Sequence, residues 1–313
     1  MQPSTGAVAA PSQPQPVPHT PPRLWPGLAF ALSGSIAFSG KAIIVKLAYR
    51  HGVDAVTLLM LRMLFALPLF LGLAWWAGRG KAALTARDWG IVFGLGFSGY
   101  YLASFLDFAG LAYISASLER LILYLNPTLV LLLGLVLHGR RIGRMQWLAL
   151  GVSYIGVLSV FGTELTLQGD HVLLGAALVF GSAVSYACYM FFSGEEVRRL
   201  GSLRLTGLAS TVACGLCIGQ FLLLRPLASV ATIAPEVISL SLLNATACTF
   251  APVILVMLGI ERLGAAMAAQ CGLVGPMSTI LMGIVLLGEP FTPMLAVGTV
   301  LVLTGVWLLA RSR

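Results

Sequence analysis

Long apolar segments, separated by short stretches that hold most of the charged residues, give this sequence its pattern. Each segment has about 18–25 residues, enough for an α-helix to cross the ~30 Å hydrocarbon core of a bilayer. Backbone groups find no water there, so each segment must satisfy its own hydrogen bonds as a helix. The pattern predicts an all-α membrane protein of ten transmembrane helices, over 24–48, 55–77, 89–110, 113–137, 146–162, 172–194, 205–224, 237–258, 262–287 and 294–311.

Residues 1–23 are rich in Pro, Gln, Ser and Ala and precede the first apolar segment. Such a composition cannot bury a hydrophobic core, so we expect a disordered N-terminal tail. The tail does not have the basic start and apolar stretch of a cleaved signal peptide. We therefore expect the first transmembrane helix to direct insertion.

The charged residues make up 10% of the chain, whereas a soluble domain has about 25%. The net charge of +8 could suggest nucleic-acid binding, but the basic residues flank the apolar segments, where orientation signals lie. With the N-terminus inside, thirteen Lys and Arg fall on the inner side, and only Arg50 and Arg225 fall on the outer side. This bias predicts an inner-membrane protein with both termini in the cytoplasm and no nucleic-acid partner.

The two halves of the chain repeat each other at an offset of 149 residues. Without a gap, the offset pairs Pro127 with Pro276, Gly134 with Gly283, Gly139 with Gly288, Met145 with Met294, and Gly156 with Gly305. We therefore expect two repeats of five helices, over 24–162 and 172–311.

Because five is an odd number, the second repeat must be inverted relative to the first. The charges agree, since Arg140, Arg141 and Arg144 of the first repeat correspond to Glu289, Pro290 and Pro293 of the second. Inverted repeats with a binding site near the membrane midplane are typical of secondary transporters. The pattern therefore predicts a transporter of a small solute.

Two segments carry a family resemblance. The run from Tyr113 through Glu119 and Arg120 to Asn126 and Pro127 resembles the fourth helix of EamA-type transporters, of the drug/metabolite transporter superfamily. The run from Ala265 through Pro276 to the Leu-Gly-Glu-Pro ending at Pro290 resembles the end of that family's second repeat. The resemblance covers about residues 25–311 and implies ten helices, two inverted repeats and a central cavity. His138-Gly-Arg140 departs from it, because a Gly-Glu pair is usual there.

Six ionisable residues lie within the predicted helices of the first repeat, and such residues usually mark function. They form one layer toward the outer ends of their helices: Lys41, Lys46, Arg62, Asp107, Glu119 and Arg120. One interpretation is an outward-facing vestibule with an excess of two positive charges, suited to carboxylate-bearing solutes. The other is a set of ion pairs that hold helices together, with Glu119 on Lys41 or Arg62 and Asp107 on Arg120.

Further site candidates are neutral. Asn126 shares a helix face with Glu119. Tyr186 belongs to a stripe with Ser182, Tyr189 and Ser193 that either lines a solute path or packs helices. The second repeat offers Gln270. Pro127 and Pro276, at equivalent positions, break their helices and are candidate hinges or structural kinks.

The resemblance implies export of an amino acid or another metabolite. We expect no cofactor, no metal site and no enzymatic activity, since there is no nucleotide-binding loop and the five cysteines all lie in apolar segments. Two alternatives stand beside a transporter. A rhomboid-like serine protease is suggested by Gly96-Phe-Ser98-Gly99, although no histidine falls inside a neighbouring helix. A structural membrane protein is the other. The solute, a coupling proton and the oligomeric state are left open.

Overall fold

The structure is a computed structural model that describes residues 24–139, 141–169 and 171–311, so the predicted tail over 1–23 lies outside the described residues. All regular structure in the described part of the chain is helical. Ten helical segments there are long and apolar enough to cross a membrane, which confirms the predicted all-α membrane fold: Trp25–Tyr49, Ala55–Gly78, Ala86–Leu111, Ala116–His138, Arg144–Thr166, His171–Gly194, Ser202–Leu224, Pro235–Leu263, Gln270–Leu287 and Pro293–Arg311.

Several of these segments consist of more than one helical element. The elements are α1 (Leu24–Tyr49), α2 (Ala55–Gly78), α3 (Ala86–Gly96), η1 (Phe97–Leu102), α4 (Ala103–Leu111), α5 (Ala116–Leu123), α6 (Asn126–His138), α7 (Arg144–Gln168), α8 (His171–Leu200), α9 (Ser202–Leu224), η2 (Leu227–Thr232), α10 (Pro235–Ala245), η3 (Thr246–Phe250), α11 (Ala251–Leu263), α12 (Ala265–Gly272), α13 (Val274–Met282), η4 (Gly283–Leu287) and α14 (Pro293–Arg311).

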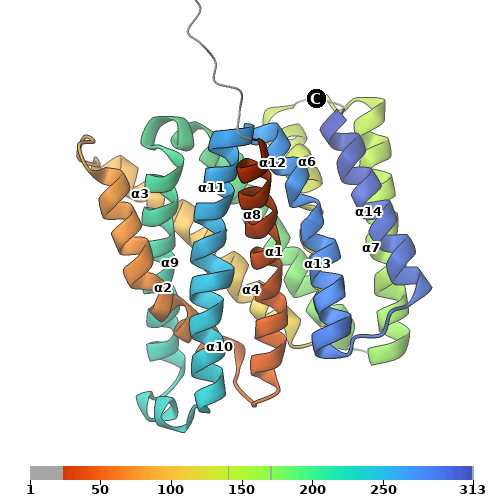
Figure 1. The fold of residues 1–313 in the computed structure, drawn as a ribbon, viewed down its shortest axis with the longest axis horizontal. Helices are drawn as coiled ribbons and strands as arrows, with labels where there is room; N and C mark the ends of the chain where they lie inside the picture. Colours follow the sequence, from red (N-terminus) through yellow and green to blue (C-terminus); the bar gives the residue numbers. More distant parts are fainter. Residues whose placement is uncertain (1–23, 140, 170, 312–313) are drawn as a thin grey trace, which may run out of the picture.

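Both ends of the described chain lie on one face of the helix bundle, at the top of Figure 1. We call the face at which α1 begins and α14 ends the proximal face, and the opposite one the distal face. The ninth segment was predicted to begin at residue 262, but Gly264, with φ of +80°, separates α11 from α12. Arg262 and Leu263 therefore still belong to the eighth segment.

Two backbone irregularities of the first half recur in the second at the 149-residue offset. A π-helical turn, η1, begins at Phe97 in the third segment, and its counterpart η3 begins at Thr246 in the eighth. The fourth segment is interrupted between α5 and α6 at Tyr124 and Leu125, and the ninth is interrupted between α12 and α13 at Leu273. The repeat therefore includes these two departures from α geometry, whereas the π-helical turn η4 has no counterpart, because the equivalent residues 134–138 lie within α6.

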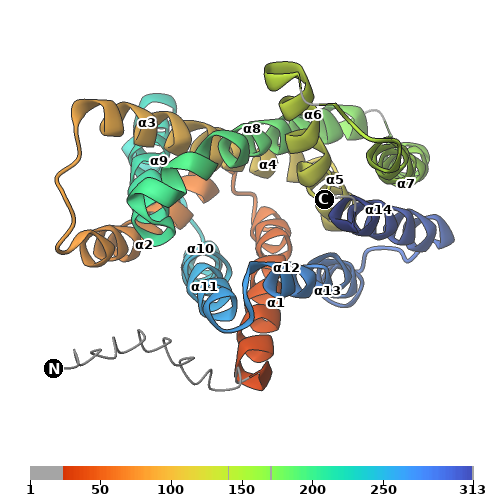
Figure 2. The same ribbon diagram turned by 90° about the horizontal axis from the view of Figure 1, so that it is seen from above.

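Helices α7 and α14 pack closely at one end of the molecule, on the right of Figures 1 and 2. A Cβ added at Gly156 of α7 would lie 2.8 Å from the carbonyl oxygen of Gly298 on α14. The equivalent atom at Gly305 of α14 would lie 2.7 Å from the carbonyl oxygen of Ala149 on α7. These two contacts are related by the repeat, so the pseudo-twofold axis passes between the two helices. Small residues permit this approach of the backbones.

Helices α2 and α9 run antiparallel and are fastened to each other at both faces. At the distal face Arg225, just after α9, forms an ion pair of 3.0 Å with Asp54, which caps the N-terminus of α2. Burial alone would raise the pKa of the Asp54 carboxyl, but hydrogen bonds from Thr57 and Arg225 outweigh it and hold the pKa below its usual value. The carboxylate is therefore kept charged at neutral pH.

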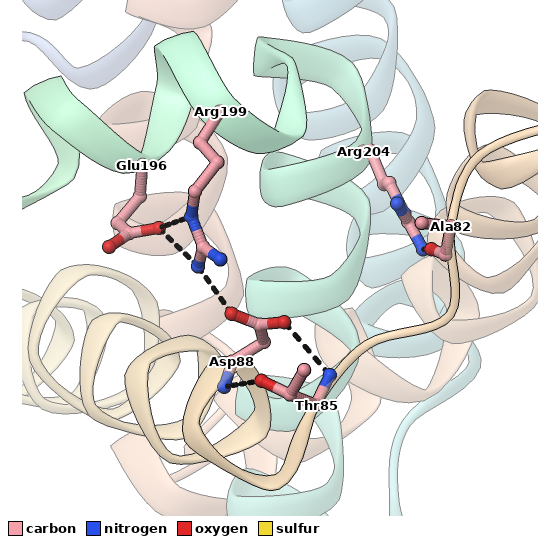
Figure 3. A network of polar contacts seen from close by, with 6 residues as sticks. All are labelled: Ala82, Thr85, Asp88, Glu196, Arg199 and Arg204. Atoms are coloured by element: carbon pink, nitrogen blue, oxygen red, sulfur yellow. Dashed lines mark hydrogen bonds and ion pairs between the residues drawn. The ribbon is translucent and has the colours of Figure 1, made fainter.

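The proximal face carries two further connections, from α9 to the linker after α2 and from α8 to α3 (Figure 3). Arg204, in the first turn of α9, donates to the carbonyl of Ala82 at 2.9 Å. Arg199 pairs with Glu196 and with Asp88, and Asp88 forms a capping box with Thr85 at the start of α3. Because α2 and α9 are tied at both ends, we expect them to move as one body.

Candidate functional site

A cavity of about 650 Å³ lies between the two repeats. It is lined by residues of both, from α1, α2, η1, α4, α5, α6, α8, α9, η3, α11 and α12. Its volume falls within the ~300–1,000 Å³ of pockets for small molecules. The lining residues reach from a buried group of charged side chains to the proximal ends of the helices, for example Thr206 near the start of α9 and Ile260 near the end of α11.

Five ionisable side chains are buried at the distal end of this cavity, and we call them the charged cluster: Lys41, Arg62, Asp107, Glu119 and Arg120. No lining residue lies beyond this cluster toward the distal face. The vestibule predicted from the sequence is therefore wrong in direction, since the cavity opens toward the proximal face. The position of each ionisable residue along its helix was predicted correctly. This position does not show on which side of the charged residues the helices separate to form a cavity.

Lys41 is the centre of the charged cluster. Its Nζ lies 2.5 Å from Asp107 Oδ2 and 3.3 Å from Glu119 Oε1, so that one ammonium serves two carboxyl groups. The predicted pairing of Glu119 with Lys41 is present. Asp107 pairs with Lys41 instead of Arg120, the partner expected from the sequence.

Arg62 and Arg120 both line the cavity and form no ion pair among the described residues. Arg62 Nε donates to Thr249 Oγ1 at 2.9 Å, and its guanidinium lies 5.1 Å from the ring centre of Phe108. Arg120 Nη2 donates to Ser39 Oγ at 2.9 Å. Arg62 Nη1 and Arg120 Nε are buried and have no hydrogen-bond partner among the described residues. Two guanidinium groups thus line the cavity without a carboxylate partner among the described residues.

The helix irregularities position these arginines. Thr249 lies in the π-helical turn η3, and its hydroxyl donates at 2.8 Å to the carbonyl of Asn244, five residues earlier. The Thr249 oxygen is thereby left to accept from Arg62. On the other side, Arg120 is in the last turn of α5, just before the interruption that separates α5 from α6. Interrupted and π-helical segments are common where a membrane protein binds a solute.

Aromatic side chains form one wall of the cavity. Tyr100 and Tyr189 share a hydrogen bond of 3.0 Å between their hydroxyl groups, and Tyr186 stacks on Tyr189 at 5.5 Å between ring centres. A Cβ at Gly99 would overlap the Tyr189 ring, so glycine is what admits this ring beside η1. Three members of the predicted stripe on the sixth segment, Ser182, Tyr186 and Tyr189, therefore line the cavity, whereas Ser193 does not.

The remaining predicted site residues divide between the cavity and its surroundings. Asn126 lines the cavity, whereas Gln270 is exposed on α12 and does not. Pro127 stands at the start of α6 and Pro276 in the first turn of α13, each just after an interruption of its segment. Their role as hinges stays a prediction. The described residues hold no group of three or more His, Cys, Asp or Glu that could bind a metal ion.

Both halves of the chain match one known family. The sequence profile of the EamA-like transporter family matches residues 25–162 and matches again over 173–311. This chain belongs to the EamA-like transporter family. Its membership also establishes the two-repeat arrangement that the 149-residue offset predicted.

Two curated relatives of this EamA-like chain are named as transporters. The uncharacterized transporter YcbK of Bacillus subtilis is 30% identical over 286 residues, which are 84% of this chain and 86% of YcbK. An uncharacterized transporter of Archaeoglobus fulgidus is 25% identical over 92% of this chain and 95% of its own length. A crystal structure described only as that of a protein matches with a TM-score of 0.62 at 18% identity, covering 91% of this chain and 98% of that one. That likeness concerns the fold alone.

The EamA-like motif near Pro290 has a role that the sequence did not show. Glu289 accepts hydrogen bonds from the backbone N–H of Ala116, at 2.7 Å, and from the hydroxyl of Ser117, at 2.6 Å, at the start of α5. Glu164, at the end of the fifth segment, accepts from the backbone N–H of Ser115 at 3.2 Å. Carboxylates suit the positive end of a helix. Two carboxylates from different segments thus close the distal side of the molecule.

Lys46 contributes to the same closure. Its ammonium donates to the carbonyls of Leu111 and Ile114, at 3.2 and 2.8 Å, and so caps the end of α4. Lys46 lies outside the main cavity. Of the six ionisable residues predicted to form one layer, five therefore meet in the charged cluster and Lys46 belongs to the distal closure. The sequence could have identified Glu289 as a candidate, because it belongs to the Leu-Gly-Glu-Pro motif after the ninth segment. The sequence could not have shown that Glu289 binds the start of α5.

Proposed function

We propose that this EamA-like transporter exports a small carboxylate-bearing metabolite, such as an amino acid, across the inner membrane. The observation that carries the proposal is the pair of buried guanidinium groups of Arg62 and Arg120, which line the cavity and have no carboxylate partner among the described residues. The guanidinium group suits the geometry of a carboxylate and stays charged when it is buried. A carboxylate of the solute would supply the missing acceptors.

The rest of the cavity fits the remainder of such a solute. Phe38, Met63, Val253 and the tyrosine wall offer apolar surface, and Asn126 offers an amide. A cavity of about 650 Å³ has room for an amino acid with some water. Export follows from the family resemblance, and the charge bias supports cytoplasmic termini. In that orientation the proximal face is cytoplasmic, and the structure corresponds to an inward-open state.

A comparison of metabolites tests the proposal. Cells that overproduce the protein should accumulate one or a few carboxylate-bearing metabolites in the medium, and cells without the gene should retain them. An untargeted comparison of medium and cell extracts by mass spectrometry measures this. A strain that overproduces the Arg62→Gln, Arg120→Gln double variant is the matched control. A solute without a carboxylate, or equal release by the double variant, would contradict the proposal.

The orientation is tested separately by reporter fusions. Fusions after residues 83, 141, 200 and 313 should report a cytoplasmic location, because the linkers at those positions carry most of the Lys and Arg. Fusions after 52, 167 and 231 should report an external one. A cytoplasmic signal at 167 would contradict the proposed orientation.

The protease alternative receives no support from the site. The hydroxyl of Ser98 donates to the carbonyl of Gly94, one turn earlier in the same helical segment, at 3.0 Å. No hydrogen bond found among the described residues joins Ser98 to a histidine. Ser98 also accepts a hydrogen bond through its carbonyl from Ser185 of α8, at 2.7 Å, which is a contact between helices.

A further inference from the structure

Within the charged cluster, two carboxyl groups form ion pairs with the same ammonium. Asp107 and Glu119 come from different elements, α4 and α5, and both approach the ammonium of Lys41 on α1. Glu119 is fully buried and Asp107 is 2% exposed. Two carboxyl groups that share one ammonium in an apolar interior disfavour each other's charged form, which favours retention of one proton between them.

The two arginines do not relieve this imbalance through direct contact. Arg62 and Arg120 donate to the hydroxyls of Thr249 and Ser39. Neither oxygen of Glu119 has a hydrogen-bond partner among the described residues, and Asp107 Oδ1 has none there either. These carboxyl oxygens are therefore available to hold a proton.

The surroundings contain few other titratable groups. Those that act on the two carboxyl groups or on Lys41 are Arg62 of α2, Arg120 of α5, Tyr49 of α1 and Cys248 of η3. The hydroxyl group of Tyr49 donates a hydrogen bond to the carbonyl of Phe108 at 2.5 Å, so its proton already has an acceptor. Cys248 is a free thiol and remains neutral at pH 7. Neither Tyr49 nor Cys248 adds positive charge, and the charges of Arg62 and Arg120 act on the carboxyl groups without forming an ion pair with them among the described residues.

We propose that Asp107 and Glu119 form a proton-binding site in which a single proton is shared between the two carboxyl groups beside Lys41. Asp107 lines the cavity and Glu119 does not, so the proton enters and leaves through Asp107. In the inward-open state it would exchange with water of the proximal face.

The site extends the proposed function, and only the link between proton and solute rests on that function. A carboxylate bound at Arg62 and Arg120 would add negative charge next to Asp107 and thereby strengthen proton binding. By reciprocity the bound proton would strengthen binding of the carboxylate by the same factor. Solute and proton would then travel in the same direction.

Infrared spectroscopy of the purified protein tests the site with no solute present. Only a protonated carboxyl group has the carboxylic-acid C=O stretch. At pH 7 the wild-type spectrum should contain one such band that is lost in Glu119→Gln. The same band should be lost in Asp107→Asn, because the remaining carboxylate then has Lys41 to itself and ionises. Asp54→Asn, in an exposed ion pair at the distal face, is the matched control and should keep the band.

Three results would overturn the proposal. The first is a spectrum in which neither variant loses a band. The second is loss in Glu119→Gln alone, which would place an independent proton on Glu119. The third is a band that does not shift in D₂O, which would exclude exchange through the cavity. If either variant fails to fold, Lys41→Met gives the answer, since removal of the ammonium should let the two groups hold a second proton and enlarge the band. An unchanged band in Lys41→Met would also contradict the site.

The infrared band and the metabolite comparison test the proton site and the proposed function independently. A shared proton without metabolite export would leave the site intact and remove the solute assignment. Metabolite export without the carboxylic-acid band would do the reverse.

Discussion

Replacing Arg120 or Arg62 by glutamine is expected to lower transport at least about tenfold, with membrane abundance close to normal. Each guanidinium would donate to the solute carboxylate, and a hydrogen bond to a charged group contributes about 1.5–3 kcal/mol. Since about 1.4 kcal/mol is a factor of ten, a loss of this size follows for each residue. Arginine to glutamine also removes a buried charge that has no ion-pair partner among the described residues, so the fold should not suffer greatly.

Counterflow of the exported solute in proteoliposomes measures this effect. Arg204→Gln is a suitable control, because Arg204 bonds the carbonyl of Ala82 at the proximal face, away from the cavity. A structural role of the arginines predicts a different outcome, in which the variants become scarce while each remaining molecule transports normally. Full transport at normal abundance in both single variants would remove Arg62 and Arg120 from the solute site.

Replacing Gly305 by leucine is expected to prevent stable assembly of α7 and α14. Its Cβ would lie 2.7 Å from the carbonyl oxygen of Ala149 and would overlap the Ser153 hydroxyl. The hydroxyl can turn away, but the backbone carbonyl cannot, so the two helices would have to separate. Overpacking a well-packed interface costs about 1–3 kcal/mol, occasionally more. In a membrane no hydrophobic effect compensates for the lost contact.

Thermal unfolding followed by size-exclusion chromatography measures the loss of folded protein. Gly151→Leu is the matched control, since Gly151 is an exposed glycine of α7 with nothing within 4 Å of an added Cβ. We expect the control to elute as the wild type and Gly305→Leu to be largely aggregated. Equal stability of the two variants would contradict the close packing of α7 on α14.

The helical segments were predictable because hydropathy alone distinguishes a membrane span from a linker. The repeat was predictable because the offset aligns residues without gaps. The interruption at Leu273 could be anticipated from Pro276, since proline disturbs the hydrogen bonds of the preceding turn. The π-helical turns η1 and η3 could not, because no residue type is required for a hydrogen bond over five residues. The interruptions that precede the two prolines were thus predictable from the sequence, and the π-helical turns were not.

The sequence predicted which residues form the site better than it predicted which of them contact each other. Ionisable residues within apolar segments are rare enough to be identified individually, and five of the six meet in the charged cluster. Their partners depend on the rotation and separation of helices that are distant in sequence. Asp107 therefore met Lys41 instead of Arg120, and the cavity opened away from the expected side. Gln270 was chosen because it is polar within an apolar segment, which does not identify the face of the helix on which it lies.

The π-helical turn η1 also fixes the angular position of α4 around the axis of the third segment. Each residue of an α-helix advances by about 100° around the axis, because a turn contains 3.6 residues. Without the additional residue of η1, α4 would be rotated by about that angle relative to α3, and Asp107 would leave the side that faces Lys41. Single-residue insertions and deletions between Gly96 and Ala103 should therefore be far rarer among functional descendants of this chain than amino-acid replacements there.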